Sequence, residues 1–168
     1  LCAVSPAKPW EVVAITFTNK AARELQDRLA RAVGGADASA IWAYTFHTCC
    51  LRILRRDIER LGYNRTFTIY DEDDKKRVIT DLIRRLKLDE KIFDARKVMG
   101  EISRAKDNLI TPRTFALEQR SEFYMGRIAD LYTLYEKEMR ENNALDFDDI
   151  IMKTVQLLQD NPDILEHY

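Results

Sequence analysis

Two short apolar segments rich in β-branched residues, each followed at once by a helical pattern, constrain the fold of this chain more than any other feature. Residues 12–17 read Val-Val-Ala-Ile-Thr-Phe, and residues 41–46 end in Tyr-Thr-Phe. Short runs of this kind are typical of strands buried on both faces of a parallel sheet. The order strand, helix, strand, helix therefore predicts an α/β layer.

The two helices of this layer have recognisable ends. Thr18-Asn19 offers a helix cap before the periodic segment 21–33, and Gly34-Gly35 is expected to end it. The second helix begins after residue 46 and closes at Gly62. Its apolar positions are Leu51, Leu54, Ile58 and Leu61.

Beyond Gly62 the pattern is helical apart from residues 67–70, which fit either a brief strand or an extended lead-in to the next helix. A stripe at Ile128, Leu131, Tyr132, Tyr135 and Met139 predicts a long amphipathic helix. Asp146 opens a helix whose apolar positions are Phe147, Ile151, Val155 and Leu158. We therefore expect a mainly α fold with a small parallel α/β remnant. Because two strands make no viable doubly wound sheet, we also expect a fragment of a longer protein.

Composition excludes several classes of protein. Of 168 residues, 46% are apolar and 33% charged, and only five Gly and four Pro are present, which argues against collagen and loop-rich all-β folds. No apolar run approaches the ~20 residues that span a bilayer, so we expect a cytoplasmic protein with no membrane partner. Cys2, Cys49 and Cys50 form neither a disulfide framework nor a zinc motif, and we expect them to be small hydrophobes.

Charge is divided unevenly along the chain. Residues 1–113 carry a net charge of +6 and residues 114–168 a net charge of −7. This division suggests one face suited to polyanions and another suited to solvent or a basic partner.

Polar residues with an aromatic ring follow both predicted strands. The first turn reads Thr-Phe-Thr-Asn-Lys over residues 16–20, and the second reads Thr-Phe-His-Thr over residues 45–48. Ligands bind outside the carboxyl ends of parallel strands, helix N-termini attract anions, and an exposed Phe can stack on a base. The alternative is two ordinary strand-to-helix turns with a cap, a core Phe and a structural His47.

Three segments resemble motifs of one family. Residues 14–25 resemble motif Ia of the UvrD/Rep/PcrA-type superfamily 1 DNA helicases, and they read Ala-Ile-Thr-Phe-Thr-Asn-Lys-Ala-Ala-Arg-Glu-Leu. The preceding Pro9-Trp10 resembles the PcrA branch of this family most. Residues 43–56 resemble the next DNA-contact motif, and residues 145–150 resemble the return from an inserted subdomain. The resemblance implies part of a RecA-like motor domain (1A) in residues 1–62, a helical 1B insertion in 63–143, and a return segment into 1A in 144–168.

The same resemblance implies DNA-contact residues. Those matched to the family's single-stranded DNA track are Phe17, Thr18, Asn19, Lys20, Thr45, Phe46 and His47. The insertion is expected to lie near forked DNA and possible protein partners. Its basic residues fit duplex contacts or a solvated face: Arg84, Arg85, Lys87, Lys91, Arg96, Lys97, Arg104 and Lys106.

The parent implied by the resemblance is a bacterial, nucleoid-associated, ATP-dependent 3′→5′ DNA helicase of the repair or replication type, using ATP and Mg²⁺. This chain contains no GxxxxGK[ST] phosphate loop, so we expect no catalytic residue, metal or cofactor site and no ATP hydrolysis by it alone. The acidic residues 71–74, and Asp146, Asp148 and Asp149, are expected to cap helices rather than hold magnesium. The alternative function is a non-enzymatic helical protein-interaction module.

Overall fold

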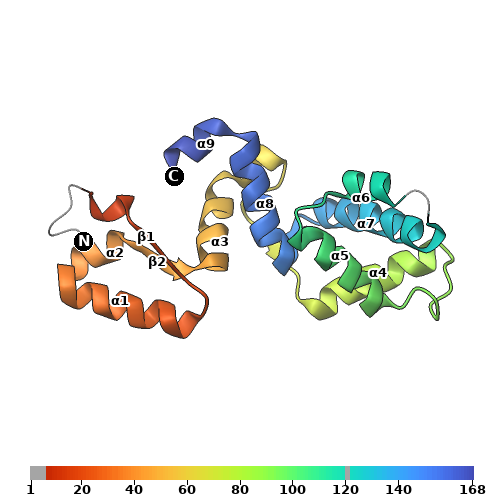
Figure 1. Ribbon diagram of the computed structural model, residues 1–168, viewed down its shortest axis with the longest axis horizontal. Coiled ribbons are helices and arrows are strands. Elements are labelled where there is room, and N and C mark those ends of the chain that lie inside the picture. The colour runs from red at the N-terminus through yellow and green to blue at the C-terminus, as the bar shows by residue number, and fades with distance from the viewer. Residues whose placement is uncertain (1–6, 120–121) are drawn as a thin grey trace. The chain divides into compact units, whose positions relative to one another are not determined.

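A computed structural model describes residues 7–119 and 122–168 (Figure 1). The chain divides into two compact units, residues 1–53 and 54–168, with the boundary inside helix α3 (Phe46–Asp57). Cys2 lies outside the described residues, whereas Cys49 is buried and Cys50 half-buried, as expected for small hydrophobes.

The first unit is a parallel strand–helix–strand arrangement. After a 3₁₀ turn at Pro9–Glu11, its elements are β1 (Val13–Thr16), α1 (Asn19–Val33), α2 (Gly35–Ala40), β2 (Trp42–Thr45) and the start of α3. β1 and β2 pair in parallel with Thr16 opposite Thr45, which confirms the α/β prediction. The short α2 was not predicted, and Gly34, at φ = +89°, separates it from α1.

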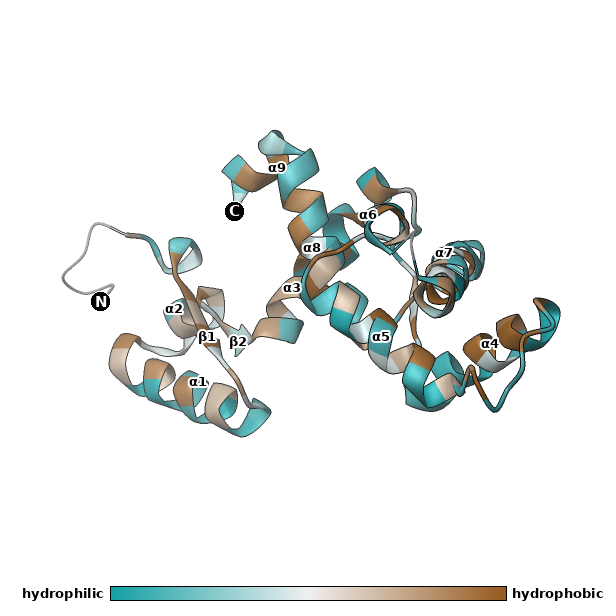
Figure 2. Cartoon of the chain, turned by 45° about the vertical axis from the view of Figure 1, so that its right-hand side comes forward, coloured by the Kyte–Doolittle hydropathy of each residue, from teal (hydrophilic) through white to brown (hydrophobic). Residues whose placement is uncertain are grey.

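The β1–β2 sheet is covered on one face only, within the described residues. The face that carries Ala43 and Thr45 is buried beneath α1, where the Gln26 amide donates a 2.7 Å hydrogen bond to the Ala43 carbonyl. On the other face Val13 is 53% and Ile15 44% exposed, and β1 is strongly apolar in Figure 2. The prediction that segment 12–17 is buried on both faces is therefore wrong here.

The second unit is a helical body with one small parallel strand pair. Its elements are the end of α3, a 3₁₀ turn at Ile58–Leu61, β3 (Thr68–Ile69), α4 (Glu72–Arg85), α5 (Ala95–Asp107), α6 (Pro112–Glu118), α7 (Phe123–Glu141), β4 (Ala144–Leu145), α8 (Phe147–Asp160) and α9 (Pro162–His167). β3 pairs with β4 in parallel, so of the two readings of residues 67–70 the brief strand is confirmed.

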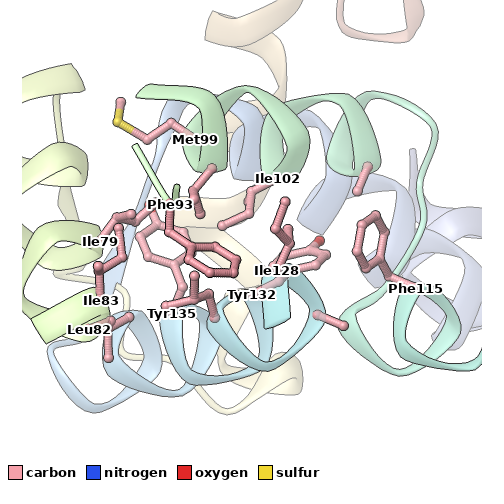
Figure 3. Packing of buried hydrophobic residues seen from close by; sticks show 14 of the residues in the cluster. Ile79, Leu82, Ile83, Phe93, Met99, Ile102, Phe115, Ile128, Tyr132 and Tyr135 are labelled. Carbon is pink, nitrogen blue, oxygen red and sulfur yellow. The ribbon is translucent and has the colours of Figure 1, made fainter. Parts of the chain in front are cut away.

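The core of this unit forms around α7. The predicted stripe from Ile128 to Met139 is buried throughout, and it packs against Ile79 of α4, Ile102 of α5 and Phe115 of α6 (Figure 3). The buried hydroxyl of Tyr132 donates to the Ile110 carbonyl at 3.1 Å, so this polar group is satisfied. The long-helix prediction is confirmed.

Helix starts follow the sequence signals closely. Asp71 accepts the Asp74 N–H at 2.8 Å at the start of α4, and Asp146 accepts the Asp149 N–H at 2.8 Å at the start of α8. Thr111 accepts the Thr114 N–H before Pro112 begins α6. The expected capping role of both acidic segments is confirmed.

Helix α8 buries a different face from the one expected. Phe147 is 56% and Ile151 37% exposed, although both lie on its predicted apolar stripe, whereas Ile150, Thr154 and Leu157 are buried. The buried face includes the charged Asp149 and Lys153, whose burial is possible because Lys106 and Glu136 of other helices pair with them.

Candidate nucleic-acid interface

The carboxyl ends of β1 and β2 bring the two predicted DNA-contact turns together. Because Thr16 pairs with Thr45 in a parallel register, the next residues, Phe17 and Phe46, leave the sheet at the same edge. Their ring centroids are 5.6 Å apart with an interplanar angle of 48°. An aromatic pair thus forms at the edge where ligands bind in parallel α/β sheets.

Both rings of this pair face solvent, though to different extents. Phe17 is 91% exposed and Phe46 44% exposed. A Phe side chain normally gains about 1.5–3 kcal/mol from burial, so a ring left in water beside a second ring marks a surface suited to a stacking ligand. The alternative of Phe17 as a core residue is wrong in this structure.

The first turn also exposes the start of a helix. Thr18 caps α1 by accepting the Ala21 N–H at 3.2 Å, and its carbonyl accepts the Ala22 N–H at 3.0 Å. Asn19 and Lys20 form the first positions of the helix and are exposed. The N-terminus of this 15-residue helix therefore presents partial positive charge beside the Lys20 ammonium, a combination that favours an anion such as phosphate.

The second turn starts α3 in a similar way. The Thr45 hydroxyl accepts the Thr48 N–H at 3.3 Å and lies 2.9 Å from the Thr48 hydroxyl. Thr45 is only 8% exposed, so its side chain shapes the start of α3, whereas Phe46 and the half-buried His47 reach the surface. Of the seven predicted contact residues, Thr45 is the one whose side chain is buried.

The basic residues expected to contact duplex DNA fall into three groups. Lys87, Lys91, Arg96 and Lys97 are exposed. Arg84, Arg85 and Arg104 pair with Glu90, Glu138 and Glu101 on the surface. Lys106 is 1% exposed and held by buried carboxylates, so its assignment as a duplex contact is wrong.

Two features of the structure escaped the sequence analysis. The Arg52 guanidinium lies 4.9 Å from the Trp42 ring centroid and 4.8 Å from that of Tyr44, and it donates to the Tyr44 hydroxyl at 2.6 Å. The second is a buried ion cluster around Lys106. Its signal was present, because Lys106 lies four residues after Ile102 on the apolar stripe of α5.

Comparison with known proteins agrees with the motif pattern. A family model described as the UvrD/REP helicase N-terminal domain matches residues 1–168. The chain belongs to the UvrD/REP helicase family. It is 44% identical over its whole length to the ATP-dependent DNA helicase PcrA of Bacillus subtilis (strain 168).

Further PcrA helicases match the chain at the same identity. It is 44% identical over 160 residues, 95% of its length, to the PcrA helicases of Staphylococcus aureus (strain Mu50) and Staphylococcus epidermidis (strain RP62A). It spans 22% of the length of each of these three relatives. No helix in the described part of the chain is long and apolar enough to cross a membrane.

Proposed function

We propose that this chain is the single-stranded-DNA-binding part of an ATP-dependent DNA helicase, with the strand crossing the edge formed by Phe17 and Phe46. The observation that carries this proposal is the solvent-facing aromatic pair, 5.6 Å between centroids, at the carboxyl edge of a parallel sheet. The identity to PcrA helicases supports it, because those relatives are named ATP-dependent DNA helicases.

The geometry suggests a division of labour among the contact residues. Phe17 stacks on a base, and the neighbouring Phe46 ring restricts the tilt of the Phe17 ring. A phosphate lies at the start of α1, near Lys20 and the backbone N–H groups of Asn19 and Lys20. Thr45 acts indirectly by capping α3, which sets the position of Phe46 and His47.

The same proposal assigns residues 1–62 and 144–168 to motor domain 1A and residues 63–143 to an inserted 1B subdomain. The pairing of β3 with β4 supports this division, because Thr68 lies opposite Ala144. The chain between them therefore leaves and returns at one place, as an insertion must. The exposed Lys87, Lys91 and Arg96 are then candidates for contact with the duplex of a fork.

The proposal places the binding of ATP and Mg²⁺ in other parts of the helicase. The sequence contains no phosphate loop, and residues 7–119 and 122–168 hold no group of three or more His, Cys, Asp or Glu side chains placed for a metal ion. We therefore assign ATP hydrolysis to other residues of the helicase. Stacking and phosphate contact are the contribution of this chain.

Binding of a fluorescently labelled oligothymidine, followed by anisotropy at several salt concentrations, tests the proposal. Phe17→Ala removes the stacking ring and should weaken binding by about 1–3 kcal/mol. Lys20→Ala removes one phosphate contact and should lower the slope of log K against log salt by about 1. Phe123→Ala, at a ring 76% exposed on α7, is the matched aromatic control, and Lys137→Ala is the matched charge control.

Two results would contradict the proposal. In the first, Phe17→Ala binds as tightly as the unaltered chain. In the second, the chain fails to bind the oligonucleotide even at low salt, which would favour a protein-interaction module.

A further inference from the structure

A cluster of charged side chains is buried between α5, α7 and α8, and we call it the Lys106 cluster. The Lys106 ammonium lies 2.7 Å from Glu136 Oε1, 2.8 Å from Asp146 Oδ2 and 2.8 Å from Asp149 Oδ1. Lys106, Asp146 and Asp149 are each 1% exposed. Three carboxylates thus surround one ammonium, and of these four groups only the Glu136 side chain, 13% exposed, reaches solvent.

Further charged groups complete the cluster from the neighbouring elements. From α4, Lys75 donates to Asp148 Oδ2 at 2.7 Å and to the Ser103 hydroxyl of α5 at 2.8 Å. From α8, Lys153 donates to Glu136 Oε2 at 2.8 Å.

The remaining titratable groups that face the cluster are tyrosines. Tyr135 of α7 donates its hydroxyl to Asp146 Oδ2 at 2.8 Å. Tyr132 of α7 and Tyr63, which precedes β3, also interact electrostatically with it, and burial raises the pKa of both hydroxyls. All three tyrosines are therefore neutral near neutral pH.

The charges of the cluster do not balance. It contains three lysines, Lys75, Lys106 and Lys153, against four carboxyl groups, those of Glu136, Asp146, Asp148 and Asp149. If every group were ionised, one negative charge would remain uncompensated in a buried site. An uncompensated buried charge costs several kcal/mol, so the folded protein gains by binding one proton.

Hydrogen bonding shows which carboxyl groups can hold that proton. Asp146 accepts Lys106, Tyr135 and the Asp149 N–H, and the half-buried Asp148 accepts Lys75 and Ser103. Among the described residues, the buried side-chain oxygens without an aligned hydrogen bond are Glu136 Oε1 and Asp149 Oδ1. Both lie within 2.8 Å of the same Lys106 nitrogen.

We propose that Asp149 and Glu136 share one proton in the folded protein, which neutralises the Lys106 cluster and makes the packing of α8 against α5 and α7 dependent on pH. The proton is taken up from solvent and is held by this pair of carboxyls, whose Oδ1 and Oε1 atoms flank the same Lys106 nitrogen.

Electrostatics favours Asp149 over Glu136 as the carboxyl that is protonated. Burial, with the Glu136 and Asp146 carboxylates, raises the pKa of Asp149 to about 7 against the opposing effect of Lys106 and Lys153. Burial also acts on Glu136, but the Lys106 and Lys153 ammoniums outweigh it and lower the pKa of that carboxyl. The two groups therefore titrate as a pair with one proton between them over the acid-to-neutral range.

The consequence for stability follows from linkage. An unfolded aspartate titrates near about 4, so between about pH 4 and pH 7 the folded state binds one more proton than the unfolded state. Stability from this pair is therefore present at acid pH and lost as pH rises toward 7. The folding equilibrium constant of unit 54–168 should fall about tenfold for each pH unit in this window through this pair alone.

Carbon-13 NMR of the side-chain carboxyls in the full chain tests the shared proton directly. We expect the Asp149 resonance to titrate with a midpoint near 7, because burial and the neighbouring Glu136 and Asp146 carboxylates raise its pKa to that value. If all four carboxyls of the Lys106 cluster titrate below about 5, the proposal is wrong.

Urea unfolding between pH 5 and pH 7, followed through the amide NMR signals of α8, gives an independent test. Asp149→Asn cannot gain or lose a proton, so the slope of its stability against pH should differ from that of the unaltered chain by about one proton. Asp130→Asn, the same substitution at an exposed carboxylate of α7 outside the cluster, should keep the unaltered slope. Equal slopes for Asp149→Asn and the unaltered chain would overturn the proposal, and the carboxyl titration decides the matter if Asp149→Asn does not fold.

Discussion

Replacing Lys106 by methionine removes one ammonium from the buried cluster while keeping a long apolar side chain of similar size. In the unaltered chain the Lys106 nitrogen lies within 2.8 Å of three carboxyl groups, those of Glu136, Asp146 and Asp149. The substitution leaves two lysines against four carboxyls. No other cation lies within ion-pair distance of Asp149 among the described residues.

The expected cost is large because the abandoned carboxylates stay buried. Removing one partner of a buried ion pair typically costs about 3–5 kcal/mol, whereas exposed pairs contribute about 0–1 kcal/mol. We therefore expect Lys106→Met to destabilise unit 54–168 by about 3–5 kcal/mol at neutral pH. The deficit should shrink as pH falls, because protonation removes the charge that Lys106 had compensated.

The assay must report on the second unit alone. Both tryptophans, Trp10 and Trp42, lie in unit 1–53, so tryptophan fluorescence does not follow the cluster. Hydrogen exchange of the α5, α7 and α8 amides follows it directly. Arg84→Ala, which breaks an exposed pair with Glu90, is the control and should change nothing measurable. If Lys106→Met changes the free energy of unfolding of unit 54–168 by less than about 1 kcal/mol, the reasoning is refuted.

Three further outcomes follow from the structure. Burial alone would raise the pKa of Asp146, but Lys106 and Lys75 outweigh it and hold this pKa at about 2. The stability that this carboxylate contributes is therefore present above about pH 4 and lost as pH falls toward 2. Near-ultraviolet circular dichroism of the tyrosines would follow the loss. Gly62→Ala should destabilise unit 54–168 by about 1–2 kcal/mol in urea unfolding, because φ is +78° and a Cβ there lies 3.0 Å from Arg140 Nη1. Gly100→Ala should stabilise the same unit by about 0.5–1 kcal/mol, since Gly100 is inside α5 and its Cβ would meet open space. Opposite signs for the two glycine variants would contradict the backbone argument.

Local signals in the sequence were enough to place most helices. Thr18, Asp71 and Asp146 each accept a backbone N–H at the start of the helix that they were expected to begin. Such caps depend on residues three apart in the chain, so the sequence alone specifies them. The same holds for the buried stripe of α7, whose helical spacing fixes one face.

Burial by distant elements could not be predicted in the same way. Val13 and Ile15 read as core residues, yet whether a strand is covered on its second face depends on elements far away in the sequence. Lys106 occupies an apolar stripe, but the carboxyls that make its burial possible come from α7 and α8, at least 30 residues later. Phe147 is exposed, and the buried face of α8 carries Asp149 and Lys153, whose charged side chains give no sign of burial in the sequence.

The candidate interface shows both kinds of inference. Phe17 and Phe46 were predicted at the ends of two strands, 12–17 and 41–46, and the parallel register brings their ring centroids to 5.6 Å. The sequence did not reveal that the Thr45 side chain is turned inward to cap α3. Residue type identified the candidate DNA-contact residues. Only the packing distinguished side chains that reach the surface from side chains, such as that of Thr45, that position them.

Amide and aromatic NMR shift mapping of the full chain during addition of a short oligothymidine tests the central claim most directly. If DNA crosses the edge of the β1–β2 sheet, the largest shifts should fall on residues 17–20 and 46–47, with the Phe17 ring signals moving upfield as a base stacks on it. Shifts confined to unit 54–168, with residues 17–20 unmoved at saturation, would contradict the account.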